Sequence, residues 1–63
     1  MTQKELLYVE DAVEHERSII KICNDLLTKL NDTSLIAFIE EQIGSHENMR
    51  NELISFLKER ANG

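Results

Sequence analysis

Two ionisable residues, Glu16 and His46, occupy positions where this sequence otherwise places apolar side chains. Glu16 lies between Val13 and Ile20 in a row that advances by alternating steps of three and four residues, and His46 lies in a similar row further along. Carboxylate and imidazole groups act as acids, bases and metal ligands in proteins. Because a charged group is rarely buried without a partner, these two residues are the strongest indication of a site.

The steps of three and four residues predict two amphipathic helices. The first should run from about residue 3 to 30 and begin with a capping box formed by Thr2 and Glu5. The second should run from about residue 34 to 61. The first row comprises Leu6, Val9, Val13, Glu16, Ile20, Cys23, Leu27 and Leu30, and the second comprises Leu35, Ile39, Gln42, His46, Met49, Leu53 and Phe56.

Residues 31–34, Asn-Asp-Thr-Ser, form the one cluster of turn-forming residues and predict a tight connection, with Asp32 or Thr33 capping the second helix. A short connection makes the helices antiparallel. Folding the chain about residue 31 pairs row positions whose numbers sum to 62, which places Glu16 opposite His46. We therefore predict a single all-α unit over residues 1–63, a two-helix antiparallel hairpin.

Further apolar residues flank both rows, so each helix has a wider apolar face than one partner helix can cover. A chain of 63 residues also seldom builds a sufficient core alone. We expect two hairpins to form a homodimeric four-helix bundle. The expected core and interface residues are Val13, Ile20, Cys23, Ile39, Gln42, Met49, Leu53 and Phe56.

Composition excludes several classes of function. The net charge is −5 and the seven basic residues are scattered, which disfavours nucleic-acid binding. No apolar run is long enough to span a bilayer, and the N-terminus lacks a signal-peptide pattern, so we expect a cytoplasmic protein without membrane contact. Cys23 is the only cysteine and is expected to be a small buried hydrophobe.

The Glu16–His46 pair has two interpretations. It can be a structural layer, with Gln42 one turn away, that fixes register and oligomeric state at some cost in stability. It can also be a metal site, because these ligands on facing helices suit iron, manganese or zinc, and a dimer would double them to four. His15 and Asp11 form a weaker second pair, best explained as solvated surface residues.

Glu16 on the first helix, and His46 after Glu40-Glu41 on the second, resemble half of a ferritin-like bundle, similar to small rubrerythrin-like and spore-coat-F-like hairpins. In that superfamily the first helix contributes a Glu and the second a Glu-x-x-His. The resemblance implies that Glu16 and His46 are metal ligands. Ile43 stands where the family has its second Glu, so we do not expect di-iron oxidase chemistry.

Three functions follow, in order of preference. The first is a homodimeric structural or interaction protein, a spore-coat-like component by resemblance, located in the cytoplasm or within a spore or its coat, and engaging a protein partner or assembly. The second is a ferritin-like metal-binding protein. The third is a regulatory hairpin that docks on a signalling protein, resembling short sporulation regulators through Ser45 and Glu47. We expect no catalytic residues, no required cofactor and no enzymatic activity, because no nucleophile–base arrangement or phosphate-binding loop is present.

Overall fold

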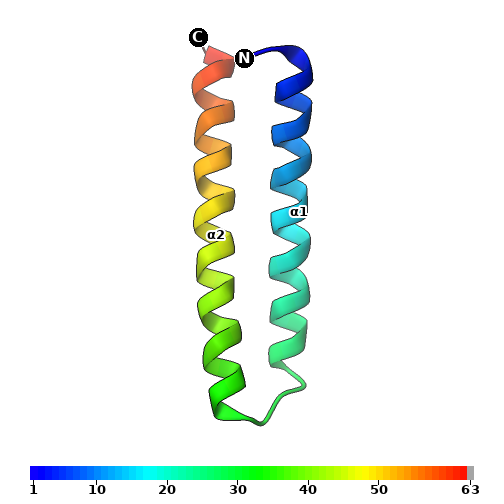
Figure 1. The fold of residues 1–63 in the computed structure, drawn as a ribbon, viewed down its shortest axis with the longest axis vertical. Helices are drawn as coiled ribbons and strands as arrows, with labels where there is room; N and C mark the ends of the chain where they lie inside the picture. The colour runs from blue at the N-terminus through cyan, green and yellow to red at the C-terminus, as the bar shows by residue number, and fades with distance from the viewer. Residues whose placement is uncertain (63) are drawn as a thin grey trace.

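The computed structural model is a hairpin of two long antiparallel helices (Figure 1). Helix α1 spans Gln3–Leu27 and helix α2 spans Thr33–Asn62. The backbone is described for residues 1–62 and the side chains for residues 1–60. The helices lie side by side along their whole length in a rod of 47 × 14 × 12 Å, with both termini at one end and the turn at the other. The predicted all-α hairpin is confirmed.

The first helix begins at the predicted capping box. The Thr2 backbone N–H donates to Oε1 of Glu5 at 2.8 Å, and the Glu5 backbone N–H donates to Oγ1 of Thr2 at 3.1 Å. These two bonds satisfy donors that the first turn of a helix cannot pair internally. The hydrogen bond from the Thr2 backbone also lowers the pKa of Glu5 below its ordinary value of 4.5, because it stabilises the carboxylate form.

The connection between the helices comes earlier than the sequence predicts. Helix α1 ends at Leu27 rather than near residue 30, and the connecting residues are 28–32 rather than 31–34. The Thr28 hydroxyl donates to the Asp25 carbonyl oxygen at 2.7 Å, and the Lys29 N–H donates to the Leu26 carbonyl oxygen at 2.9 Å. Each of these bonds reaches a carbonyl oxygen three residues earlier, and together they tighten the last turn and end the helix. Asp32 then caps α2, because its Oδ1 accepts from the Leu35 N–H at 2.9 Å.

The surface of α2 that faces α1 differs from the predicted row. In α1 the residues of the predicted row are all buried or half-buried, whereas in α2 Leu35, Met49 and Phe56 are exposed. Their places facing α1 are taken by the flanking residues Ile36, Ile43, Arg50 and Leu57, which join Ile39, His46 and Leu53. The seam of α2 is therefore rotated by one position, because the choice between the two rows depends on how side chains interlock across the space between the helices. Arg50 can lie there with its aliphatic stem inside and its charge outside.

The core of the hairpin is very small. Val13, Ile20 and Ile39 are its only buried apolar residues among the described side chains, with exposed fractions of 4%, 9% and 9%. None of the large described side chains is completely buried. Two helices alone enclose little volume, so most apolar residues that contact the other helix are still half-exposed. The hairpin therefore leaves much apolar surface in contact with solvent.

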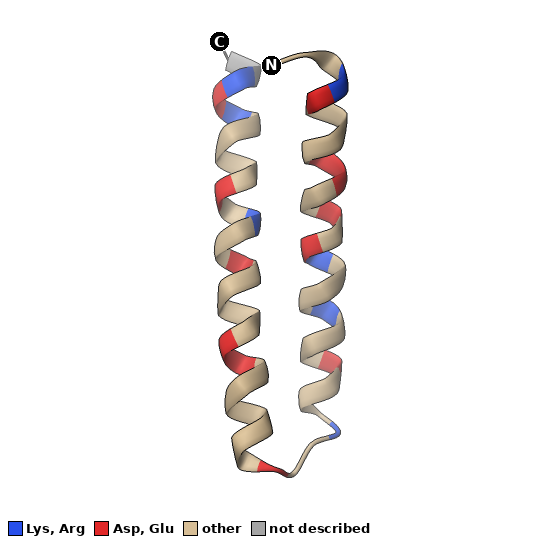
Figure 2. Cartoon of the chain, in the orientation of Figure 1, with Lys and Arg blue, Asp and Glu red and all other residues tan. Residues whose placement is uncertain are grey.

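Charge is spread along both helices with an acidic excess, as Figure 2 shows. The first turns of α2 carry no charged residue before Glu40 apart from the cap, Asp32. Within the described part of the chain, neither helix has a stretch apolar enough to cross a bilayer.

Gly44 lies inside α2, where a glycine costs about 1 kcal/mol relative to alanine. A Cβ added at this position would meet no atom within 4 Å, so no close approach requires the glycine. We predict that Gly44→Ala stabilises the fold by about 1 kcal/mol and raises Tm by roughly 4–8 °C. Thermal denaturation followed by circular dichroism measures this, and an unchanged or lower Tm would show that the position is crowded in the functional assembly.

Candidate functional site

Glu16 and His46 contact each other across the hairpin, as their predicted shared level requires. Nδ1 of His46 donates to Oε2 of Glu16 in a hydrogen bond that joins α1 to α2. The pair lies close to the middle of both helices, because Glu16 is near the centre of Gln3–Leu27 and His46 is near the centre of Thr33–Asn62. The side chains are 17% and 30% exposed, respectively. The pair is therefore largely shielded within one hairpin but not completely buried.

The other residues considered for this layer do not join the hydrogen bond. Gln42 is half-buried on the neighbouring turn of α2, and no hydrogen bond links its described side chain to Glu16 or His46. His15 and Asp11 are both exposed on α1. Within one hairpin the polar contact therefore consists of Glu16 and His46, and Gln42, His15 and Asp11 lie outside it.

A metal ion bound by one hairpin would have only two ligands. Among the described residues, no group of three or more His, Cys, Asp or Glu side chains lies close enough to hold a metal ion. Imidazole and carboxylate suit zinc, manganese or iron in chemical type, but a stable site needs about four ligands. The donor set fits a metal only if a second hairpin doubles it.

One face of the hairpin, which we name the apolar face, carries most of its exposed large apolar side chains. On a helix, residues at spacings of three, four and seven lie on one side. On α1 this side holds Tyr8 and Ile22, which are 61% and 65% exposed, together with Leu26 and the smaller or half-buried Ala12 and Ile19. On α2 the matching side holds Leu35, Phe38, Met49 and Phe56, which are 41–54% exposed. On both helices the residues of the exposed row come one position before residues that face the other helix. Because the helices are antiparallel, this shared offset turns both rows toward the same side of the hairpin.

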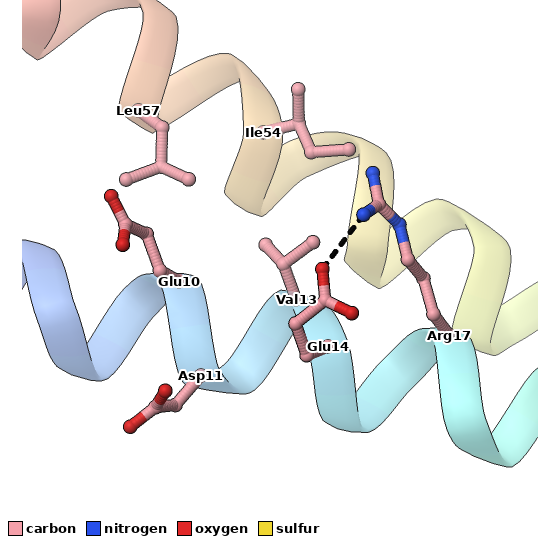
Figure 3. A pocket seen from close by; sticks show the side chains of 7 residues that line it. All are labelled: Glu10, Asp11, Val13, Glu14, Arg17, Ile54 and Leu57. Carbon is pink, nitrogen blue, oxygen red and sulfur yellow. Dashed lines mark hydrogen bonds and ion pairs between the residues drawn. The ribbon is translucent and has the colours of Figure 1, made fainter.

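The other side of the hairpin carries charged residues of α1, some of which Figure 3 shows around a hollow. A shallow hollow there has an apolar floor of Val13, Ile54 and Leu57, and charged residues of α1 form its rim. Arg17 pairs with Glu14 at 2.7 Å across one end of the hollow. Both side chains are more than half exposed, so this pair contributes little to stability. The exposed large apolar side chains are thus concentrated on the apolar face, and charged side chains of α1 surround the hollow.

The apolar face is the surface feature that the sequence pattern described least accurately. Leu35, Met49 and Phe56 were expected in the contact between the two helices of one chain, and the hairpin leaves them exposed. Gln42 belongs to the same outward row. The seven-residue spacing from Leu35 through Gln42 and Met49 to Phe56 was the signal for this stripe.

Comparison with known proteins adds no family assignment, because no protein-family model, curated protein or solved structure matches the chain significantly. The polar contact between Glu16 and His46 and the apolar face are the two features of the hairpin that bear on its function.

Proposed function

We propose that this chain is a small structural and interaction protein that works as a homodimer, in which two hairpins cover each other's apolar face to form a four-helix bundle. The observation that carries the proposal is the row of exposed aromatic and aliphatic side chains along one face of both helices. Contiguous apolar patches of this kind mark protein interaction sites in soluble proteins. A second hairpin has the right length and the same stripe to cover it.

The surface area of the hairpin agrees with this proposal. A compact monomer of this mass exposes about 4,200 Å², whereas the hairpin exposes 4919 Å². The excess of about 700 Å² over a compact monomer is close to the roughly 800 Å² that each partner buries in a standard interface. If a second copy covered the apolar face, the accessible surface area of each chain would therefore fall to about that of a compact monomer.

Native mass spectrometry tests the homodimer directly. We expect the unmodified chain to show the mass of two copies at micromolar concentration, with a monomer fraction that grows on dilution. A monomer at every concentration up to about the millimolar range, where even weak complexes form, would overturn the proposal.

The sequence resemblance gives the proposed dimer a biological setting. Spore-coat-F-like hairpins share the Glu-then-His pattern of Glu16 and His46, and a component of a spore coat or similar assembly needs a stable helical unit with an outer surface for neighbours. The polar side of the hairpin, with the hollow above Val13, is the surface left free for such contacts in the dimer.

Metal binding is a second candidate function, favoured by the contact between His46 and Glu16 at mid-length. In a dimer the two pairs would supply four ligands for zinc, manganese or iron. Such an ion would crosslink the two hairpins. Glu16 would bind through its carboxylate and His46 through its imidazole.

We predict for this candidate that the dimer binds one zinc ion and that His46→Ala loses it in native mass spectrometry. Glu41→Gln is the control, because it removes an exposed carboxylate that points away from the pair. If His46→Ala retained zinc, the proposed metal site would be wrong, and Glu16 and His46 would form a structural layer. Equal loss in Glu41→Gln would show that the ion binds surface carboxylates.

A further inference from the structure

We infer that the hairpin opens locally from the end that holds its two termini, and that the contact between Glu16 and His46 limits how far this opening reaches. That end lies opposite the turn (Figure 1). The inference concerns the single hairpin and does not depend on the proposed homodimer. Local opening occurs where a structure has few buried contacts and few bonds between its elements.

The buried core lies away from the terminal end. Residues of α1 and α2 whose numbers sum to 62 share a level along the rod, as Glu16 and His46 do. All the buried apolar residues therefore lie between levels 13 and 23 of α1, and they are Val13, Ile20 and Ile39. Residues 3–12 of α1 and 50–60 of α2, which we name the terminal arms, contain no buried side chain.

The inner side chains of the terminal arms are only half-buried. Leu6 and Val9 of α1, and Leu53 and Leu57 of α2, belong to the seam and are still partly exposed to solvent. Leu57 also forms part of the floor of the hollow in Figure 3, so its packing is incomplete on that side. Separating the arms therefore exposes less apolar surface per residue than separating the buried core, and it costs less free energy.

The polar contact between the helices lies beside the inner limit of the terminal arms. Within the described part of the chain, the hydrogen bond from His46 to Glu16 is the only side-chain hydrogen bond or ion pair that joins α1 to α2. Opening the arms leaves this bond intact. Opening past it breaks the bond and leaves two partly shielded polar groups without their partners, which adds a further cost.

The other half of the hairpin is held together by the turn. Residues 28–32 join the helices there, so the ends of α1 and α2 stay close even when their side chains separate. The terminal arms have no such connection, and helical segments of their length are marginal in water when they lack a partner. The hairpin therefore has a closed state and a state in which the arms are apart and their inner leucine and valine side chains are exposed.

Amide hydrogen exchange, followed residue by residue by NMR, tests the opening. Residues 7–12 and 50–58 represent the arms, and residues 17–24 and 37–43 represent the rest of the two helices. We expect protection factors at least about tenfold lower in the arms, because opening the other segments also exposes a buried valine or isoleucine. Equal protection in all four segments would overturn the inference, since the hairpin would then open only as a whole.

His46→Ala tests whether the polar contact limits the opening. We expect low protection to spread from the arms into residues 13–16 and 46–49, which the unmodified protein protects. Ile39→Val is the control, because it weakens the buried core on the other side of the contact and should lower protection throughout without moving the boundary. A boundary that stays in place in His46→Ala, or that moves equally in Ile39→Val, would show that the contact does not limit the opening.

Glu16→Gln provides the same test if His46→Ala does not fold. A neutral side chain of the same length makes a weaker hydrogen bond than a carboxylate, so the boundary should move in the same direction by a smaller amount. A boundary identical to that of the unmodified protein in this variant would also contradict a limiting role.

The native mass of the same samples separates this inference from the homodimer. A second copy would cover large apolar residues in both halves, such as Tyr8 in the arms and Phe38 near the turn, so the difference in protection should persist in a dimer. A monomeric mass with low protection confined to the arms would overturn the homodimer alone. A dimeric mass with uniform protection would overturn the local opening alone.

Discussion

Replacing both Phe38 and Phe56 by lysine is expected to dissociate the homodimer and to reduce its helical content. The two side chains are 54% and 48% exposed in one hairpin. Burying the exposed half of a phenylalanine contributes about 1 kcal/mol, and a dimer buries four of them. Their loss weakens association by about 4 kcal/mol, or roughly a thousandfold in Kd. The added lysine charges weaken it further, because they would have to leave water.

We expect folding and association to be coupled. A single hairpin has only Val13, Ile20 and Ile39 buried in the described part of the chain, and isolated helices are marginal in water. A partner that binds only the folded form stabilises it in proportion to its concentration. Sedimentation velocity and circular dichroism should therefore report the loss of mass and of helicity together, and dilution of the unmodified protein should lower Tm.

Leu7→Lys is the matched control for these substitutions. Leu7 is 54% exposed, the same fraction as Phe38, but lies about 100° around α1 from the apolar face. We expect this variant to retain its dimeric mass. A dimer that survives lysine at both phenylalanines, or one that dissociates equally with Leu7→Lys, would show that the apolar face is not the interface.

The hairpin could be predicted from sequence because several local signals agree. Thr2 and Glu5 mark the start of α1, the polar cluster around Asp32 marks the turn, and steps of three and four residues mark both helices. The opposition of Glu16 and His46 followed from the two apolar rows and a turn between them, and it is confirmed by their hydrogen bond. Local signals of this kind determine the fold and the level at which residues meet.

The rotation of α2 could not be predicted by the same means. Residues Leu35, Met49 and Phe56 and residues Ile36, Ile43 and Leu57 form two apolar rows with seven-residue spacing, one on each side of Ile39. Each row also includes one polar residue, Gln42 in the first and Arg50 in the second. Periodicity cannot choose between rows of equal quality, because the choice depends on how side chains interlock across the seam. In the proposed four-helix bundle one row would pack inside each hairpin and the other would pack between the two hairpins.

The early end of α1 is a different kind of deviation. Leu30 continues the apolar row and suggested a longer helix, but Thr28 bonds back to the Asp25 carbonyl oxygen and stops it. Leu30 lies in the connecting segment and is half-buried there, so the apolar pattern continues beyond the end of the helix. Periodicity indicates which residues are buried more reliably than where a helix ends.

Removing both members of the Glu16–His46 pair is expected to have the opposite effect from removing one. His46→Leu alone leaves the Glu16 carboxylate partly buried without its partner, and Glu16→Leu alone leaves His46 without its acceptor. Each single change should lower the free energy of unfolding by about 1–3 kcal/mol per chain. The double change, Glu16→Leu with His46→Leu, removes both polar groups and should be at least as stable as the unmodified protein, since apolar replacement of a buried pair is often neutral or stabilising.

A double-mutant cycle measured by urea denaturation at fixed protein concentration gives the coupling energy, which we expect to be at least about 2 kcal/mol, because both single losses of about 1–3 kcal/mol are absent from the double variant. The same cycle at Glu14 and Arg17, an exposed pair with 67% and 54% exposed side chains, is the control and should give less than about 0.5 kcal/mol. Equal coupling at the two sites, or additive single losses at Glu16 and His46, would contradict the prediction.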